Sequence, residues 1–457
     1  MHISSRRLFI SCIFMALVFK VLVMAVSAYS YDLLYMVKGS IVTPGRGMRL
    51  GTYWTYLLGG LYRFWLLLPV EHVGLENWFR SKPFPIAFGD FLLISILKLP
   101  ILLLDLACGY IIYKIALLER GESSALRAFT IWICNPLVTL TAEMDGSNDI
   151  LIATLALATA YFFIRGSPGS SSLALTAGVA AKLYAILVAP VLILFSTRRR
   201  AFAVASASIL GAAIYILWTT KSGLGSLLST LLNYTPLTFA ASEALLTPYD
   251  SRIGLATFSG FLYFYLVYRF WRGGDVIDAL FGFLLVYMAF LNWWPPYLLL
   301  LLPFITLELS KGRGGKAYMI LILVTISLYI LCQANEFGLV GGNASFYIWN
   351  YHPWMEKASG HLIRFSSDVT VKLVVAPILR SAYTALSIIY GLRLLLWNSP
   401  ELKALFARMK ISPSRLVPSL RAASFKTAIE GGDVHPVAHG EGMETKDGQP
   451  RTSLTSV

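Results

Sequence analysis

The chain has 457 residues, of which 57% are hydrophobic and only 14% are charged. Soluble domains carry roughly 25% charged residues, so a soluble fold would have too little polar surface to cover itself. The formal net charge of +14 comes from Lys and Arg clusters between apolar runs and in the tail. That placement marks cytoplasmic loops of a membrane protein and not a nucleic-acid-binding surface.

Apolar runs recur along the chain, each long enough to cross a bilayer as a helix. The first run, 8–27, follows two arginines that predict a cytoplasmic N-terminus. A cleaved signal peptide is the alternative, but Lys20 interrupts the apolar stretch, and we expect a retained helix. An external segment, 29–85, follows. Within it, 53–70 is rich in Tyr, Trp and Leu and predicts an interfacial helix, with one more crossing as the alternative.

The sequence therefore predicts an all-α integral membrane protein with about ten transmembrane helices and both termini in the cytoplasm. The expected spans are 8–27, 88–115, 127–141, the run ending at Arg165, 203–219, 253–270, 276–291, 295–309, 317–332 and 369–397. Alternation fails at 171–196, where both ends should be cytoplasmic. We expect a re-entrant helical hairpin there. Residues 1–397 then form one multi-pass cell-membrane domain, and 398–457 form a basic, largely disordered cytoplasmic tail.

Polar residues that suit chemistry gather at the predicted external face, some of them in a short acidic turn. The candidates at this face are Asp32, Glu143, Asp145, Asp149, Arg252 and His352. Carboxylates beside aromatic rings suit sugar binding and removal of a proton from a hydroxyl. An arginine at the rim suits a lipid phosphate, which it can bind with two parallel hydrogen bonds.

Each candidate also has an ordinary structural interpretation. A carboxylate just past a helix end, such as Asp32, is often only solvated. Asp149 can cap the fourth span, and Asp145 can simply be exposed. The aromatic residues around His352 suit an interfacial belt. Lys182, in the middle of the hairpin, indicates a functional charge or a buried ion pair, with a lysine that reaches to the interface as the alternative.

The order of these features resembles the GT-C glycosyltransferases, polytopic enzymes that take sugars from polyprenyl-phosphate donors. It is closest to the mannosyltransferase-like branch that includes GPI mannosyltransferase I. The matching residues, within 29–303, are Asp32, Leu104-Asp105-Leu106-Ala107, Ile111-Ile112-Tyr113-Lys114, Asn135-Pro136, Gly146 and Asp149 at the spacing of a Gly-Gln-x-Asp run, Ala177-Gly178, Lys182, Pro190, Pro296-Tyr297 and Leu302-Pro303. The chain departs from the family in having Ser147 where Gln is usual and no second Asp beside Asp32.

The resemblance implies an inverting transferase that moves a hexose, expected to be mannose, from a polyprenyl- or dolichyl-phosphate donor to a lipid-linked glycan or similar acceptor. By carry-over, Asp32 is the expected catalytic base, and Arg252 offsets the charge of the departing phosphate. The expected acceptor- or donor-binding residues are Glu143, Asp145, Asp149, Lys182, Arg252 and His352. We expect no cofactor, metal or nucleic acid. A secondary transporter, which the interrupted hairpin would suit, or a lipid flippase is the alternative.

Overall fold

The computed structural model describes residues 3–29, 52–70, 88–219, 263, 265, 267, 268, 275–290, 295–311, 316–332, 344–346, 361, 362 and 364–397. The chain divides into two compact units, Met1–Ser399 and Pro400–Val457. All described residues belong to the first unit. Nearly all of them are helical, which confirms the predicted all-α class for this part of the chain. Most of the predicted span 253–270 and the whole predicted tail lie outside the described residues.

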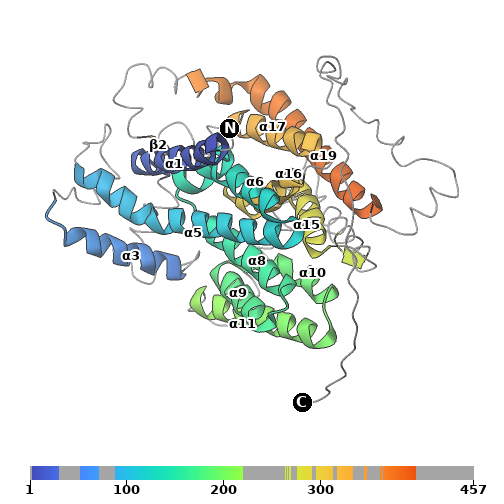
Figure 1. The fold of residues 1–457 in the computed structure, drawn as a ribbon. Helices are drawn as coiled ribbons and strands as arrows, with labels where there is room; N and C mark the ends of the chain where they lie inside the picture. The colour runs from blue at the N-terminus through green and yellow to red at the C-terminus, as the bar shows by residue number, and fades with distance from the viewer. Residues whose placement is uncertain are drawn as a thin grey trace, which may run out of the picture. The chain divides into compact units, whose positions relative to one another are not determined.

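Figure 1 shows the helices in chain order. They are α1 (Ile3–Val26), α3 (Thr52–Leu66), α5 (Phe88–Arg120), α6 (Glu122–Ile133), α7 (Pro136–Val138), the π-helix η2 (Thr139–Met144), α8 (Asp149–Ile164), α9 (Pro168–Ala181), the 3-10 helix η3 (Leu183–Val188), α10 (Ala189–Leu194), α11 (Arg198–Thr219), α15 (Val276–Phe290), the 3-10 helix η4 (Pro295–Leu300), α16 (Leu302–Ser310), α17 (Lys316–Cys332), the π-helix η6 (Val371–Val375) and α19 (Ala376–Trp397).

Helix α5 is the longest described helix and contacts α1, α3, α6, α8 and α16. Its buried side chains recur every three or four residues, as expected for one face of a helix. They include Leu93, Leu97, Ile101, Cys108, Ile112 and Ile115. Helix α3 packs on α5 and confirms the helix predicted over 53–70. Its buried face carries Trp54, Leu58, Tyr62 and Trp65.

One described helix, Phe91–Arg120 with 30 residues, is long and apolar enough to cross a membrane by itself. A second candidate joins Glu122–Ile133 to Pro136–Met144, and these two pieces are bent by 42° relative to each other. Other apolar helices among the described residues have 10–17 residues. The predicted count of about ten crossings therefore stays a prediction.

The bend in the second candidate begins at Asn135, inside the predicted span 127–141. Asn135 is extended, and its Oδ1 accepts a hydrogen bond from the Leu137 N–H at 3.0 Å. Pro136 follows at the first helical position, where its missing N–H costs nothing. The Asn-Pro pair thus stops α6 and starts a new helical segment that continues as η2.

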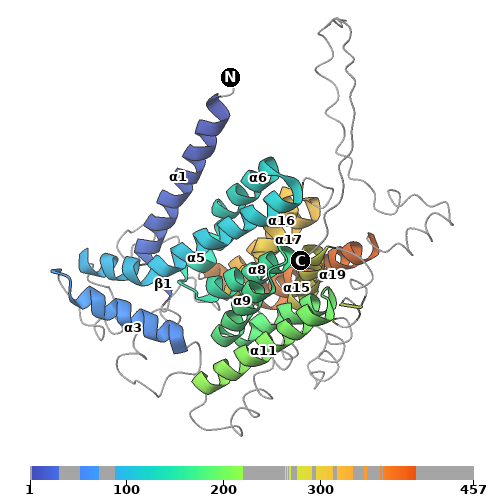
Figure 2. The same ribbon diagram turned by 60° about the horizontal axis from the view of Figure 1, so that its bottom comes forward.

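A second interruption falls at Lys182, inside the predicted hairpin. Lys182 has an extended backbone (φ −149°, ψ 129°) between α9 and η3. Helix α9 lies between α8 and α11 in Figures 1 and 2 and contacts both helices. The Thr176 hydroxyl donates to the Ala207 carbonyl at 3.2 Å, which ties α9 to α11. The interruption at Lys182 is therefore built into a packed three-helix layer.

Two short strands depart from the all-helical prediction. Strand β1 (Ser27–Tyr29) pairs antiparallel with β2 (Ala344–Phe346), with Ser27 opposite Phe346. Three residues are too short to show the alternation that predicts a strand. The pairing joins the end of α1 to a segment more than 300 residues later in the sequence.

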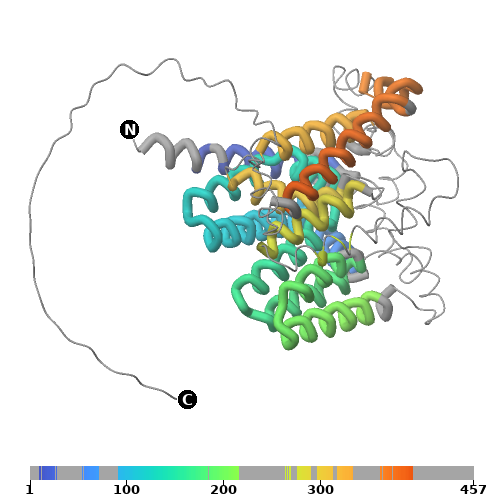
Figure 3. The backbone as a smooth tube through the Cα atoms, turned by 90° about the vertical axis from the view of Figure 1, so that its right-hand side faces the viewer, coloured from blue at the N-terminus to red at the C-terminus, as the bar shows by residue number. Residues whose placement is uncertain are grey.

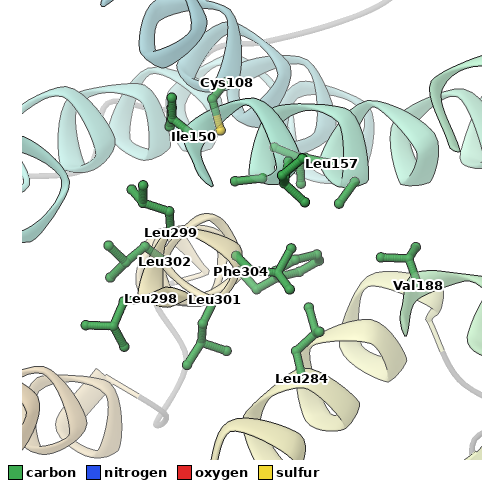
Figure 4. Packing of buried hydrophobic residues seen from close by; sticks show 14 of the residues in the cluster. Cys108, Ile150, Leu157, Val188, Leu284, Leu298, Leu299, Leu301, Leu302 and Phe304 are labelled. Carbon is green, nitrogen blue, oxygen red and sulfur yellow. The ribbon is translucent and has the colours of Figure 1, made fainter. Parts of the chain in front are cut away.

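The hydrophobic core is centred on η4 and α16. Figure 4 shows Leu298, Leu299, Leu301, Leu302 and Phe304 projecting from this segment toward the surrounding helices. The facing side chains include Ile150 and Leu157 of α8 and Leu284 of α15. Figure 3 shows α17 and α19 side by side, and these helices also contact each other. The predicted span 295–309 is therefore a central, protein-covered segment.

A buried charge cluster as the candidate functional site

The C-terminal part of α1 carries a lysine that is buried between two carboxylates. The Nζ of Lys20 lies 2.9 Å from Oδ2 of Asp105 in α5 and 3.1 Å from Oε1 of Glu143 in η2. None of the three side chains is more than 1% exposed. Charges removed from water this completely are tolerated only when they are paired and hydrogen-bonded. The trio therefore links α1, α5 and η2.

The cluster has one lysine for two carboxyl groups. Among the described residues, Oδ1 of Asp105 and Oε2 of Glu143 are buried without a hydrogen-bond partner. The Trp132 indole N–H donates to the Asp105 backbone carbonyl at 3.1 Å and holds this part of α5 against α6. Two buried carboxylate oxygens thus retain unused acceptor capacity.

A second buried lysine, Lys98, lies about two turns before Asp105 on α5. Its Nζ donates to the backbone carbonyls of Glu143 at 2.6 Å and Met144 at 2.8 Å. It also donates to the carbonyl of Ser27 in β1, and the Ser27 hydroxyl lies 3.4 Å away. Lys98 is completely buried. Its ammonium consequently joins β1 to the end of η2.

The predicted acidic turn begins at the end of η2, and the structure corrects the ordinary interpretation of Asp145 as an exposed residue. Relative exposure is 0% for Glu143, 8% for Asp145 and 3% for Asp149. Gly146 adopts φ 74°, a left-handed conformation that favours glycine. The Asp149 N–H donates to the Ser147 hydroxyl at 3.2 Å. The turn is therefore folded inward, and all three acids are buried.

Asp149 is the first residue of α8 and does not occupy the cap position, which Asn148 takes. Its Oδ1 pairs with Nζ of Lys182, the residue that interrupts the α9–η3 segment. The Lys182 side chain is 18% exposed and that of Asp149 is 3% exposed. The lysine is thus the more accessible partner of a pair that connects the acidic turn to the predicted hairpin.

Of the predicted site residues, the structure describes Glu143, Asp145, Asp149 and Lys182, and it pairs Asp149 with Lys182. Asp32, Arg252 and His352 lie outside the described residues, so their expected roles stay predictions. Glu143 was expected to bind substrate, but its Oε1 is occupied by Lys20.

The site residues that the sequence analysis missed are Lys20, Lys98 and Asp105. Each is a charge inside an apolar run, and that signal alone marks a functional or paired residue. Two of them, Lys20 and Lys98, lie in segments that were judged only as membrane spans.

A separate charged cluster joins α15, α16 and α19. Lys311 pairs with Asp278 and lies 2.8 Å from Oε2 of Glu308. The Tyr390 hydroxyl donates to Oε1 of Glu308 at 2.7 Å. Burial disfavours the Lys311 ammonium, but Asp278 and Glu308 outweigh this effect and raise the pKa of Lys311 above its ordinary value. This cluster contains none of the predicted site residues, and its contacts are those of a structural anchor.

Within the described ranges, no group of three or more His, Cys, Asp or Glu side chains is arranged to hold a metal ion. No known protein family, curated protein or solved structure matches the chain. Fold and site define a helical protein with carboxylates and ammonium groups buried between apolar helices. Its function has to be argued from those groups.

Proposed function

We propose that this protein is a multi-pass membrane glycosyltransferase of the GT-C type. It would move a hexose, with mannose as the expected sugar, from a polyprenyl- or dolichyl-phosphate donor to a lipid-linked glycan or similar acceptor. The observation that carries the proposal is that Lys98 donates hydrogen bonds both to the acidic turn, at Glu143 and Met144, and to Ser27 of β1. Strand β1 contacts η2 and ends at Tyr29, only three residues before Asp32.

The membrane part of the proposal rests on apolar side chains that no described residue covers. Phe14 and Phe19 of α1 are 63% and 57% exposed, and Phe202 and Ile209 of α11 are 76% and 71% exposed. Apolar surface of this kind calls for lipid or another apolar partner. Together with the recurring apolar runs, it supports about ten crossings, an interfacial α3, a re-entrant segment broken at Lys182 and two cytoplasmic termini in the cell membrane.

The chemical part of the proposal assigns the base to Asp32. Three residues of extended chain span at most about 11 Å, so the chain can separate Asp32 from Tyr29 by no more than that distance. A carboxylate there would remove the proton of the acceptor hydroxyl while the sugar leaves its lipid phosphate with inversion. No covalent sugar–enzyme intermediate, cofactor or metal is required by this scheme.

The remaining residues divide into two groups by their contacts. Asp145, Asp149 and Lys182 would bind the acceptor or donor, since Lys182 keeps an accessible side chain beside a buried acid. Arg252 and His352 would face the lipid phosphate and the sugar. Glu143 would hold the geometry of the turn through Lys20, because its carboxylate is fully buried in that pair.

A secondary transporter is the second candidate, and the break at Lys182 is the observation that favours it. Interrupted helices in membranes build substrate and ion sites from freed backbone groups and nearby charges. On this alternative, Lys182 and Asp149 would be required and Asp32 would be dispensable.

The test is an in vitro transfer assay with purified protein, radiolabelled polyprenyl-phosphate sugars and a membrane lipid extract. We expect wild type to form a labelled lipid or glycan and Asp32→Asn to lose at least about 100-fold in rate, the lower range for a general base. Asp368→Asn is the matched control, since exposed Asp368 only accepts bonds from the Thr370 and Val371 N–H groups. Transfer by Asp32→Asn at the wild-type rate would remove Asp32 as the base. No transfer by folded wild type would favour the transporter.

A further inference from the structure

The hydrogen bonding of Lys98 differs from that of three other lysines in the described part of the chain. Lys20, Lys182 and Lys311 each have a carboxylate within salt-bridge distance. Among the described residues, Lys98 instead donates to three backbone carbonyls, those of Ser27, Glu143 and Met144. An ammonium has three N–H donors, so these carbonyls use its full capacity.

The three carbonyls belong to two separate segments. Glu143 and Met144 end η2, and the last carbonyls of a helix have no partner within that helix. The Ser27 carbonyl belongs to β1, whose partner strand is only three residues long. A buried carbonyl without a hydrogen bond is costly, so Lys98 stabilises both segments at once.

The two segments that Lys98 joins are the ones that lead to the proposed reacting groups. Ser27 precedes the proposed base, Asp32, by five residues, and Met144 directly precedes Asp145. The contact is made entirely to backbone and reaches both segments from one point on α5.

We propose that Lys98 is a positioning residue for sugar transfer, which sets the distance between the segment carrying Asp32 and the acidic turn that binds the acceptor. This inference rests on the proposed function. Lys98 does not touch substrate, and it acts only through the two backbone segments. A misplacement of about 1 Å in a reacting group can cost roughly 100-fold in rate. Loss of Lys98 should therefore lower kcat with little change in KM for the lipid donor.

The experiment compares Lys98→Met, which removes all three donors, with Lys98→Gln, which keeps two N–H donors without the charge. Lys114→Met is the matched control on the same helix, since Lys114 lies over the Tyr110 ring and contacts neither segment. Transfer kinetics are measured together with hydrogen–deuterium exchange of the whole protein in detergent. We expect Lys98→Met to lower kcat by about 10- to 100-fold and KM to change less than about threefold. Lys98→Gln should lie between Lys98→Met and wild type.

Exchange provides the readout that separates positioning from general stability. Faster exchange in Lys98→Met confined to 27–29 and 143–149 supports the inference, whereas equal acceleration in α8, α9 and α11 overturns it. Should Lys98→Met fail to fold, Lys98→Gln decides, and wild-type kcat in that variant overturns the inference. If wild type shows no transfer activity, both the proposed function and the positioning role of Lys98 are wrong. If wild type is active and Lys98→Met is equally active, only the positioning role is wrong.

Discussion

Lys20 of α1 and Asp105 of α5 form an ion pair 2.9 Å long, although 85 residues separate them in the sequence. Both side chains are buried, and the same ammonium reaches Glu143 of η2. The C-terminal part of α1 is thereby held against the two elements that precede the acidic turn. Because the far side of α1 exposes large apolar side chains, we expect this charged contact to specify which face of α1 meets α5.

Replacing Lys20 should be strongly destabilising. Lys20→Met leaves two uncompensated carboxylates in the protein interior, which we expect to cost about 3–5 kcal/mol in the free energy of unfolding. The measurement is denaturant unfolding in mixed micelles, with exposed Lys316→Met as a control that stays within about 0.5 kcal/mol of wild type. The triple variant Lys20→Met/Asp105→Asn/Glu143→Gln should recover part of the loss. Equal loss in Lys20→Met and Lys316→Met would contradict this account of the cluster.

The pair between Asp149 and Lys182 should show energetic coupling across the helix break. Each single change, Asp149→Asn or Lys182→Met, leaves a charge without its partner, whereas the double change removes both charges. We therefore expect a coupling energy of about 0.5–3 kcal/mol in a double-mutant cycle of unfolding free energies. Strictly additive effects would mean that the two side chains act independently. The same variants, assayed for transfer, would show whether the pair binds substrate.

Local features of the fold could be predicted because they leave a local pattern. Helix α3 was expected at 53–70 and lies at Thr52–Leu66, and α15 and α17 begin within one residue of their predicted starts. The interruption near Lys182 was also predicted, because both ends of 171–196 should be cytoplasmic and one continuous crossing would break the alternation of the spans. The helix positions need only neighbouring residues, whereas the interruption also needs the charges that flank the run.

The partners of buried charges could not be predicted in the same way. Lys20, Lys98 and Asp105 are visible in the sequence as costly charges, but each finds its partners on another element. Nothing in the spacing of one apolar run indicates which run packs against it. The burial of Asp145 was missed for a related reason, because a polar turn looks solvated until the elements that cover it are known. Strand β1 was missed because three residues carry no pattern.

Gly146 should be intolerant of a side chain because of its backbone conformation. Its φ of 74° lies in the left-handed region, where a residue with a Cβ pays roughly 1–2 kcal/mol. Gly146→Ala should therefore destabilise the protein by that amount and lower transfer by displacing the acidic turn. Gly60→Ala is the control, since Gly60 lies within α3 with nothing within 4 Å of an added Cβ. That change should stabilise α3 by about 0.5–1 kcal/mol, and a neutral Gly146→Ala would contradict the strained turn.

Gly211 should be intolerant for a different reason, which is the close approach of α9 to α11. A Cβ added there would lie 2.8 Å from the Thr176 carbonyl oxygen and 2.8 Å from Cβ of Val179. The first atom is backbone and cannot rotate away, so the helices would have to separate. We expect Gly211→Ala to cost about 1–3 kcal/mol in unfolding free energy, the usual range for overpacking.

Two further variants test whether that close approach is the cause. Gly169→Ala lies on α9 with open space around the added Cβ, so it should be neutral or slightly stabilising. Val179→Ala keeps the Val179 Cβ, which is the atom that a Cβ added at Gly211 would meet. Adding Val179→Ala to Gly211→Ala should therefore not restore stability. Because α9 leads directly to Lys182, separating α9 from α11 should also loosen the Lys182–Asp149 pair. Hydrogen–deuterium exchange should then rise at 182–188 in Gly211→Ala and stay at the wild-type rate in Gly169→Ala. Wild-type stability and exchange in Gly211→Ala would show that α9 and α11 are not in close backbone contact.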